Sequence, residues 1–312
     1  MKERWYFSSR IPSEIFRKLA ILKSMRRTTT RLSYLPILIS GLIVAAPALH
    51  AQEGSEHFRR ALEARFAGQT EAAIAEYKRG LQSQPNNVDG RMQLGALLLE
   101  ERGDLDGAIS EFMTAVGIDP SCATCESRLN EAMEIKNSKP SDLVIKANLL
   151  YSSGQINRAA AGYRIAIQAD PNNAEAHNAL AWTLYKLGGA KNLAEGVKEV
   201  QEALRLKPDD AEYINTWACL LYDQGDIEGA MSKWHKAISN SKKPSAADLY
   251  GLAVGSLSKG DKTNALRYYK DSIATDPKYA EMQYVRDRVG MSVHTVAGHE
   301  QLSQMAGKED SK

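Results

Sequence analysis

Two cysteines lie close together in the chain, at Cys122 and Cys125, in the order Cys-Ala-Thr-Cys. Pro120 precedes them and Ser121 is a suitable N-cap, so both thiols are expected in the first turn of a helix. The dipole and the free N–H groups of a helix N-terminus stabilise a thiolate, which is the arrangement that thiol–disulfide exchange uses. Three interpretations stay open: a local structural disulfide, a pair of packed free thiols, or a redox-active pair.

Metal, haem and hydrolytic chemistry lack their motifs in this sequence. A zinc site needs two ligands besides these cysteines, and a c-type haem site needs a histidine where Glu126 stands. The six histidines form no metal-ligand spacing, and there is no glycine-rich phosphate loop or nucleophile elbow. We therefore expect a protein that is not an enzyme and that holds no metal or cofactor. The third cysteine, Cys219, is expected to be an ordinary small residue within a helix.

Residues 1–51 have the composition of a secretory signal peptide. They carry nine Lys or Arg against two Glu, and the uncharged stretch Leu35–Leu49 is followed closely by small residues that offer cleavage after Ala48 or Ala51. A leader of ordinary proportions begins at Met25, which is an alternative start. The alternative to cleavage is a membrane anchor, although the apolar stretch is shorter than the roughly 20 residues of a typical span. We expect export, to a bacterial periplasm.

The charge of the chain changes once this leader is set aside. The whole chain carries +2 at pH 7 and the leader +7, which leaves −5 for the other 261 residues. A nucleic-acid-binding protein needs a basic body rather than a basic leader, so no nucleic-acid partner is expected.

One pattern repeats six times after the leader. Each copy ends a first apolar stretch with a glycine, at Gly68, Gly103, Gly154, Gly188, Gly225 and Gly260. After each glycine come a small residue, a mostly aromatic position, a second small residue and, in five copies, a proline. Small residues allow two helices to approach closely, the aromatic ring fills the gap beside them, and proline ends the second helix. Because one unit cannot bury its apolar face alone, the units must stack.

This unit resembles the tetratricopeptide repeat, a helix–turn–helix of 34 residues. The clearest copies are GQINRAAAGYRIAIQADPNN (Gly154–Asn173) and GDKTNALRYYKDSIATDPKY (Gly260–Tyr279). The resemblance covers residues 53–279. It implies an all-α fold, a tetratricopeptide-repeat helical solenoid in which helix–turn–helix pairs form a right-handed superhelix.

The spacing of the glycines predicts how the units are grouped. Gly103 and Gly154 are one and a half units apart, so we expect an odd helix and a discontinuity between them. The predicted segments are units 1–2 over 53–120, an odd linker or cap helix over 121–139, units 3–6 over 140–279, a capping helix over 280–297 and a disordered tail over 298–312.

In tetratricopeptide repeats the first helix of each pair lines a concave groove, and the resemblance carries the lining positions onto this chain. The implied partner-binding residues are Asn148, Tyr151, Asn178, Trp182, Tyr185, Lys186, Asn215, Tyr222 and Tyr250, and the same positions include Cys219 and Asp223. Tyr151, Tyr185 and Tyr222 recur at one position, about 10 Å apart if the helices pack normally. An extended peptide would then meet a tyrosine at roughly every third residue. The alternative is that tyrosine is simply common at this position in the family.

The function that these observations favour is a non-enzymatic protein–protein interaction scaffold of the cell envelope, with a peptide or partner protein held in the groove. The alternatives are a thiol–disulfide role for Cys122 and Cys125, or a membrane-tethered envelope assembly factor. Chaperone-binding relatives place Lys and Arg in this groove. Tyrosine and asparagine occupy most of the positions here, so that function is not transferred.

Overall fold

The computed structural model describes residues 53–289 and 293–309. The predicted leader, its cleavage sites and the alternative start at Met25 lie outside the described residues. Residues Gly54–Lys312 form one compact unit.

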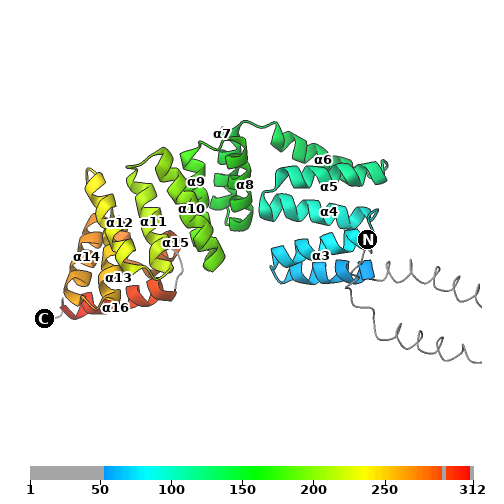
Figure 1. The fold of residues 1–312 in the computed structure, drawn as a ribbon. Helices are drawn as coiled ribbons and strands as arrows, with labels where there is room; N and C mark the ends of the chain where they lie inside the picture. Colours follow the sequence, from blue (N-terminus) through cyan, green and yellow to red (C-terminus); the bar gives the residue numbers. More distant parts are fainter. Residues whose placement is uncertain (1–52, 290–292, 310–312) are drawn as a thin grey trace, which may run out of the picture. The chain divides into compact units, whose positions relative to one another are not determined.

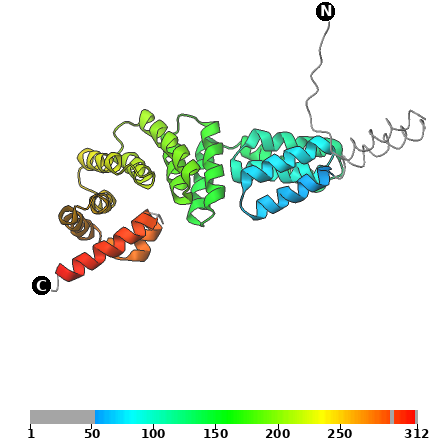
Figure 2. The ribbon, with the colours of Figure 1, turned by 60° about the horizontal axis from the view of Figure 1, so that its bottom comes forward.

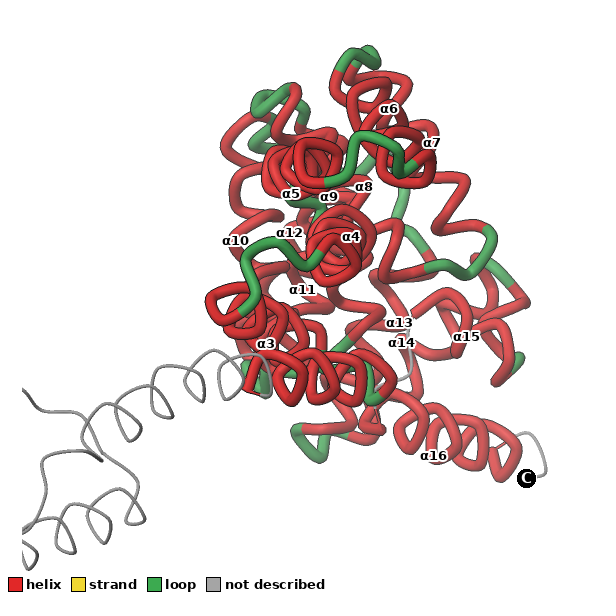
Figure 3. The backbone as a smooth tube through the Cα atoms, turned by 90° about the vertical axis from the view of Figure 1, so that its right-hand side faces the viewer, coloured by secondary structure: helices red, strands yellow, loops and turns green. Residues whose placement is uncertain are grey.

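The described part of the chain is built from helices in a repeated array, which confirms the all-α prediction (Figures 1 and 2). Figure 3 shows no strand in it. A helix over 53–66 comes first. The helices that follow are α3 (Thr70–Ser83), α4 (Val88–Leu97), the π-helical turn η2 (Leu98–Arg102), α5 (Leu105–Ile118), α6 (Ala123–Lys136), α7 (Pro140–Ser152), α8 (Ile156–Ala169), α9 (Ala174–Leu187), α10 (Ala190–Leu206), α11 (Ala211–Asp223), α12 (Ile227–Asn240), α13 (Ala246–Ser258), α14 (Lys262–Thr275), the 3₁₀ turn η3 (Pro277–Ala280), α15 (Met282–Val289) and α16 (Val293–Glu309).

Turn and cap residues set the ends of these helices. Each of the six repeated glycines adopts a positive φ between the two helices of its pair, a conformation that other residues adopt at a cost. An aspartate often follows and caps the second helix: Asp226 Oδ1, for example, accepts a hydrogen bond of 2.9 Å from Gly229 N. Five second helices end two residues before a proline. Local sequence therefore specifies where each pair begins, turns and stops.

The two helices of a pair approach closely because small residues face aromatic ones. A Cβ atom at Gly251 of α13 would lie 2.2 Å from the ring of Trp234 on α12. The mostly aromatic repeat positions are buried in all six units, as are the alanines beside them. The repeated pattern thus marks the core of the array rather than its surface.

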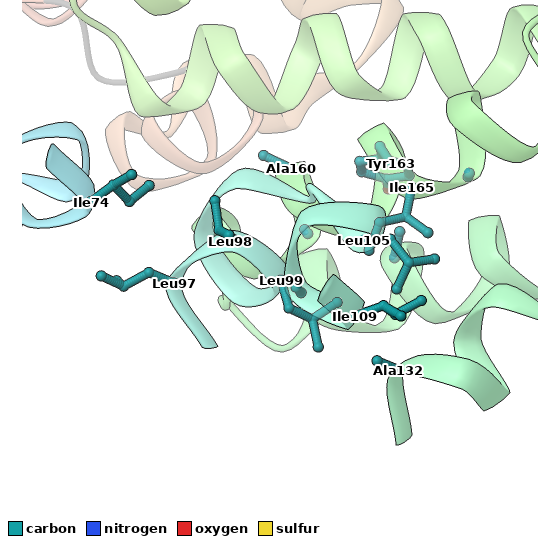
Figure 4. Close-up of a cluster of buried hydrophobic side chains, with 14 of the residues drawn as sticks. Ile74, Leu97, Leu98, Leu99, Leu105, Ile109, Ala132, Ala160, Tyr163 and Ile165 are labelled. Carbon is teal, nitrogen blue, oxygen red and sulfur yellow. The ribbon is translucent and has the colours of Figure 1, made fainter. Parts of the chain in front are cut away.

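The odd helix α6 packs against α5. The contact between the third unit and the first two is made by η2, which packs directly against α8. Figure 4 shows Leu98 and Leu99 of η2 in the same apolar cluster as Ile109, Ala160 and Tyr163. The backbones come close there: a Cβ atom at Gly103 would lie 2.4 Å from the carbonyl oxygen of Ala161.

The C-terminal region corrects two expectations. The segment 280–297 is not one capping helix, because α15 ends at Val289 and a separate helix, α16, begins at Val293. The expected disordered tail contributes most of α16, and Leu302 is fully buried. The reason is that α16 covers α13 and α14, whose apolar faces have no further repeat to pack against.

Candidate binding groove on the first helices

A groove of about 1080 Å³ runs along the first helices of units 3 to 6. Its walls come from α7, α9, α11 and α13, with contributions from α8, α12, the end of α14, η3 and α15. Of the residues predicted from the repeat positions, those that line it are Asn148, Tyr151, Asn178, Trp182, Tyr185, Asn215, Cys219 and Tyr222. The predicted surface therefore lies largely along one continuous groove.

Tyr250 was expected in this groove and is instead a core residue. Its exposed fraction is 0%. The rings of Tyr279 and His299 pack on it with centroid distances of 5.5 and 6.0 Å. Its surroundings are supplied by η3 and α16, which the repeat pattern does not describe, so the lining position in unit 6 is covered.

Lys186 was also expected in the groove and lies beside it. Its Nζ is 5.8 Å from the ring centroid of Trp182 and donates a hydrogen bond of 3.4 Å to the carbonyl oxygen of Arg286. Arg286 belongs to α15, so the C-terminal segment reaches back to α9. Asp223, at the end of α11, does not line the groove either.

The three equivalent tyrosines do not present equal surfaces to the groove. Tyr151 is half-buried, whereas Tyr185 and Tyr222 are only 4% and 6% exposed. The Tyr222 hydroxyl shares a hydrogen bond of 2.9 Å with Ser258 Oγ, and the Tyr185 ring packs on Trp182 at 5.1 Å. These two tyrosines form the floor of the groove, and Tyr151 remains accessible in its wall.

Hydrogen bonds fix several polar side chains along the wall. Trp182 Nε1 donates to the Tyr151 hydroxyl at 2.8 Å, which ties α9 to α7. Asn215 Nδ2 donates to Asp248 Oδ1 at 2.6 Å, which ties α11 to α13. Asn178 differs: its side chain is 7% exposed and its Oδ1 has no hydrogen-bond partner. A buried acceptor left unpaired costs about 1–3 kcal/mol, which a ligand N–H would recover.

Acidic side chains also line the groove, and the repeat positions did not predict them. They are Glu175, Asp210, Glu212, Asp248 and Asp276. Most of them sit at the start of a first helix, before the positions that the resemblance supplied. The available signal was the recurrence of Asn-Ala-Glu at Asn173 and Asp-Ala-Glu at Asp210, where each helix begins.

Three of these carboxylates lie close to the same groove residue, Tyr213, and act on its pKa. The pKa of the Tyr213 phenol is raised to about 12, first by burial and then by the charges of Asp210, Glu175 and Glu212. Asp210 also caps α11, with Oδ1 accepting from Glu212 N at 3.0 Å and Tyr213 N at 3.3 Å. The groove therefore has an acidic edge where α9 and α11 begin.

The cysteines occupy two different environments. Cys122 and Cys125 are joined in a disulfide at the start of α6, where Cys122 is half-buried and Cys125 is fully buried. Cys219 lies in the groove floor, and burial raises the pKa of its thiol to about 12, so it is a poor nucleophile at neutral pH.

Two features are absent from residues 53–289 and 293–309. No helix there has both the length and the apolar character needed to cross a membrane. No cluster of three or more His, Cys, Asp or Glu side chains there could hold a metal ion.

Comparisons with known proteins agree with this architecture. Models described as "Tetratricopeptide repeat" and "TPR repeat" match residues 58–121 and 147–188. The human DnaJ homolog subfamily C member 3 is 24% identical over 236 residues, which are 72% of this chain and 46% of that protein. The type IV pilus assembly protein PilF of Pseudomonas aeruginosa is 25% identical over 191 residues, 57% of this chain and 74% of PilF.

Among solved structures, the Thermus thermophilus protein TTC0263, described as a thermophilic TPR protein, matches with 19% identity and a TM-score of 0.41 over 65% of this chain and 96% of its own. The structure of Pseudomonas aeruginosa PilF matches with 16% identity and a TM-score of 0.37 over 77% of this chain and 98% of its own. The chain spans less than half of the human relative. With its repeated helical pairs and the two repeat matches, the chain is a tetratricopeptide-repeat protein.

Proposed function

We propose that this protein is a non-enzymatic scaffold of a bacterial cell envelope and that it holds an extended segment of a partner protein in the groove of its first helices. The observation that carries this proposal is the groove wall itself. It combines aromatic rings, which offer apolar area and polar edges, and asparagine side chains, whose amide groups can form hydrogen bonds with a peptide backbone. The unpaired Oδ1 of Asn178 suits the N–H of such a segment.

The cellular location rests on different support. The leader over residues 1–51 has the composition of an export signal, and one relative is named as a pilus assembly protein. Fractionation of the source cell, followed by determination of the N-terminal residue of the protein, tests this part. An N-terminus at Leu49 or Gln52, in the periplasmic fraction, supports export. Protein that retains the leader in the membrane fraction supports the tethered assembly factor, and protein in the cytoplasmic fraction contradicts both.

The groove itself is tested by photo-crosslinking with the full chain in its own cells. A photoreactive amino acid is placed at Ala179, which lines the groove, and in a separate variant at Arg205, which is exposed on the second helix α10. We expect Ala179 to crosslink to one short contiguous segment of a partner, and Arg205 to give no such product. The added change Trp182→Ala should remove the crosslink while the helical circular dichroism spectrum is retained. Equal crosslinking from both positions, or products from Arg205 alone, would contradict the proposal.

Thiol–disulfide exchange is the second candidate, and the unequal exposure of the two cysteines favours it. Cys122 is half-buried and Cys125 is fully buried, so a partner thiolate would attack at Cys122. Attack on Cys122 would form a mixed disulfide and release the Cys125 thiolate, and the partner's second thiol would then resolve it. The exchange also runs in reverse: in a Cys125→Ser variant the Cys122 thiolate can attack a disulfide of an oxidised partner and release one partner thiolate, and this mixed disulfide should accumulate because no Cys125 thiol is present to displace the partner. If no adduct forms while groove crosslinking persists, the disulfide has a structural role only.

A further inference from the structure

The groove has an unbalanced set of charges. Its described lining includes five carboxylates and no lysine, arginine or histidine. Three of the five accept hydrogen bonds within the fold: Asp248 from Asn215 and Ser245 Oγ, Asp276 from the Tyr284 hydroxyl at 3.2 Å, and Asp210 from the two backbone N–H groups that it caps. Asp210 and the two remaining carboxylates, Glu175 and Glu212, form the acidic edge. Of these, Glu175 and Glu212 are exposed.

Most carboxylates on the second helices have cationic partners, whereas those of the acidic edge form no ion pair. Glu195 pairs with Arg164 at 2.8 Å, Glu202 with Arg205 at 2.7 Å, and Glu228 with Lys259 at 2.6 Å. None of the ion pairs among the described residues involves Glu175, Asp210 or Glu212. The protein thus neutralises its outer carboxylates internally and leaves a negative edge facing the groove.

Three lysines lie near the groove, each over an aromatic ring: at the acidic edge, Lys207 Nζ is 5.9 Å from the ring centroid of Tyr213, and the other two lie on the opposite side. Lys186 lies over Trp182 and contacts α15, and Lys278 Nζ is 5.7 Å from the ring centroid of Tyr284. The starts of α9 and α11 therefore carry three carboxylates against one lysine, with which none of them forms an ion pair, and the side beside α15 carries two lysines. A ligand cation is attracted to the first side and repelled from the second.

Other groups of the groove suit the same ligand. The ring of the half-buried Tyr151 can accept the cation of a lysine or arginine side chain, and a desolvated contact of this kind contributes up to about 2 kcal/mol. The side chain of Asn178, more than nine-tenths buried in the wall, keeps an acceptor without a partner. A peptide supplies backbone N–H donors for this oxygen and, in the same molecule, cationic side chains for the acidic edge.

We propose that the groove selects an extended, basic peptide segment, with lysine or arginine side chains directed to Glu175 and Glu212 and backbone N–H groups directed to Asn178. This inference rests on the proposed function of the groove and specifies the chemistry of its partner. Acidic and neutral segments are discriminated against because they leave the carboxylates of the acidic edge desolvated without a counter-charge.

Fluorescence anisotropy with three labelled peptides of about ten residues tests the proposal. The first has lysine at every third position, which matches the spacing of successive repeats along an extended chain. The other two replace every lysine with glutamine or with glutamate. We expect the lysine peptide to bind the full chain at least about tenfold more tightly than the glutamine peptide, which corresponds to about 1.4 kcal/mol, and the glutamate peptide to bind most weakly. Added salt should reduce the differences in affinity between the three peptides, because it screens the charges of the exposed carboxylates.

Matched variants separate the acidic edge from the groove as a whole. Glu175→Gln/Glu212→Gln should reduce lysine-peptide binding to the level of the glutamine peptide. Glu202→Gln/Glu228→Gln removes two carboxylates from second helices and should leave binding unchanged. If all three peptides bind equally and Trp182→Ala abolishes binding, the charge preference is wrong and the groove function stands. If the lysine peptide binds with the same affinity to the wild type, to Trp182→Ala and to the acidic-edge variant, both proposals are wrong.

Discussion

At the scale of single residues, two buried histidines respond to acid in opposite directions. His299 is 2% exposed in α16, and burial lowers the pKa of its imidazole, although a hydrogen bond to the carbonyl oxygen of Ala280 opposes that shift. His177 is 6% exposed in α9, and its Nδ1 lies 2.6 Å from Glu199 Oε2. That carboxylate raises the pKa of His177, and burial opposes it.

The direction of each shift determines the direction of its effect on stability. The folded state binds fewer protons than the unfolded state at His299, so its contribution is present above the ordinary pKa of about 6.5 and is lost as the pH falls below it. At His177 the folded state binds more protons. Its contribution is full below that ordinary value and is lost as the pH rises through the raised pKa of the folded state.

Thermal unfolding at about pH 7.5 and about pH 5.5 separates these two effects, because the interval includes the ordinary histidine pKa. We expect His299→Phe to lose less stability than the wild type on acidification, because no buried imidazole must be protonated. His177→Phe should lose more, because it lacks the group that acid stabilises. The readout is the difference in Tm between the two pH values for each variant. Identical differences in all three proteins would contradict the assignment.

The repeat positions predicted which residues line the groove where a residue contacts only its own and adjacent units. They did not predict it where a helix from outside the repeats covers the position. Asn148, Asn178 and Asn215 line the groove because each faces only its own and adjacent units. Tyr250 occupies the corresponding face of α13 but is covered by α16, which lies about forty residues further along the chain. A repeat pattern carries no information about a helix outside the repeats, so this burial could not be predicted from it.

At the scale of elements, the contact between η2 and α8 depends on the backbone of Gly103. Its φ is 68°, and a Cβ atom there would lie 2.4 Å from the carbonyl oxygen of Ala161. Gln168 Nε2 also donates to the Gly103 carbonyl oxygen at 3.1 Å. The glycine therefore serves both a turn and a close approach between two units.

A pair of matched substitutions measures the close approach separately from the turn. Gly154→Ala places a side chain at φ 79° with no heavy atom within 4 Å, so it should cost only the backbone strain, about 1–2 kcal/mol. Gly103→Ala adds a clash with the backbone of α8 and should cost about 1–3 kcal/mol more. Urea unfolding of both variants gives the difference in free energy. Equal costs would mean that η2 and α8 separate without penalty, and the junction between units 2 and 3 would then be loose.

The sequence contained the signal for both turns but not for this difference between them. Glycine at a fixed repeat position predicts positive φ in every unit, and the structure shows it at Gly103 and Gly154 alike. α8 approaches one turn and not the other because the third unit packs on η2, and the residues of the turn do not encode that contact. The acidic edge was missed although Asn-Ala-Glu and Asp-Ala-Glu recur at the starts of α9 and α11, because the expected lining residues were taken from Asn178 and Asn215 onward.

At the scale of the whole molecule, a local loss of stability is expected to affect neighbouring units more than distant ones. In a stacked array each unit contacts only its neighbours, so a local change weakens nearby helices first. Here the last unit has α16 in place of a further repeat, with Leu302 fully buried against the helices of that unit. The docked α16 is thus the element that ends the array at its C-terminal side.

Leu302→Ala tests this arrangement because it removes apolar volume from the cover without changing the repeats. It should cost about 2–5 kcal/mol, whereas Gln304→Ala on the exposed face of the same helix should change stability by less than about 0.5 kcal/mol. Amide hydrogen exchange then shows where the loss falls. We expect faster exchange in α13, α14 and α16 and unchanged exchange in α3, α4 and α5, because no contact of Leu302 reaches the first two units. Faster exchange in every helix would show that the chain unfolds as one cooperative body. In that case the binding groove, which includes α13 and ends at α15, would share the stability of the first units as well.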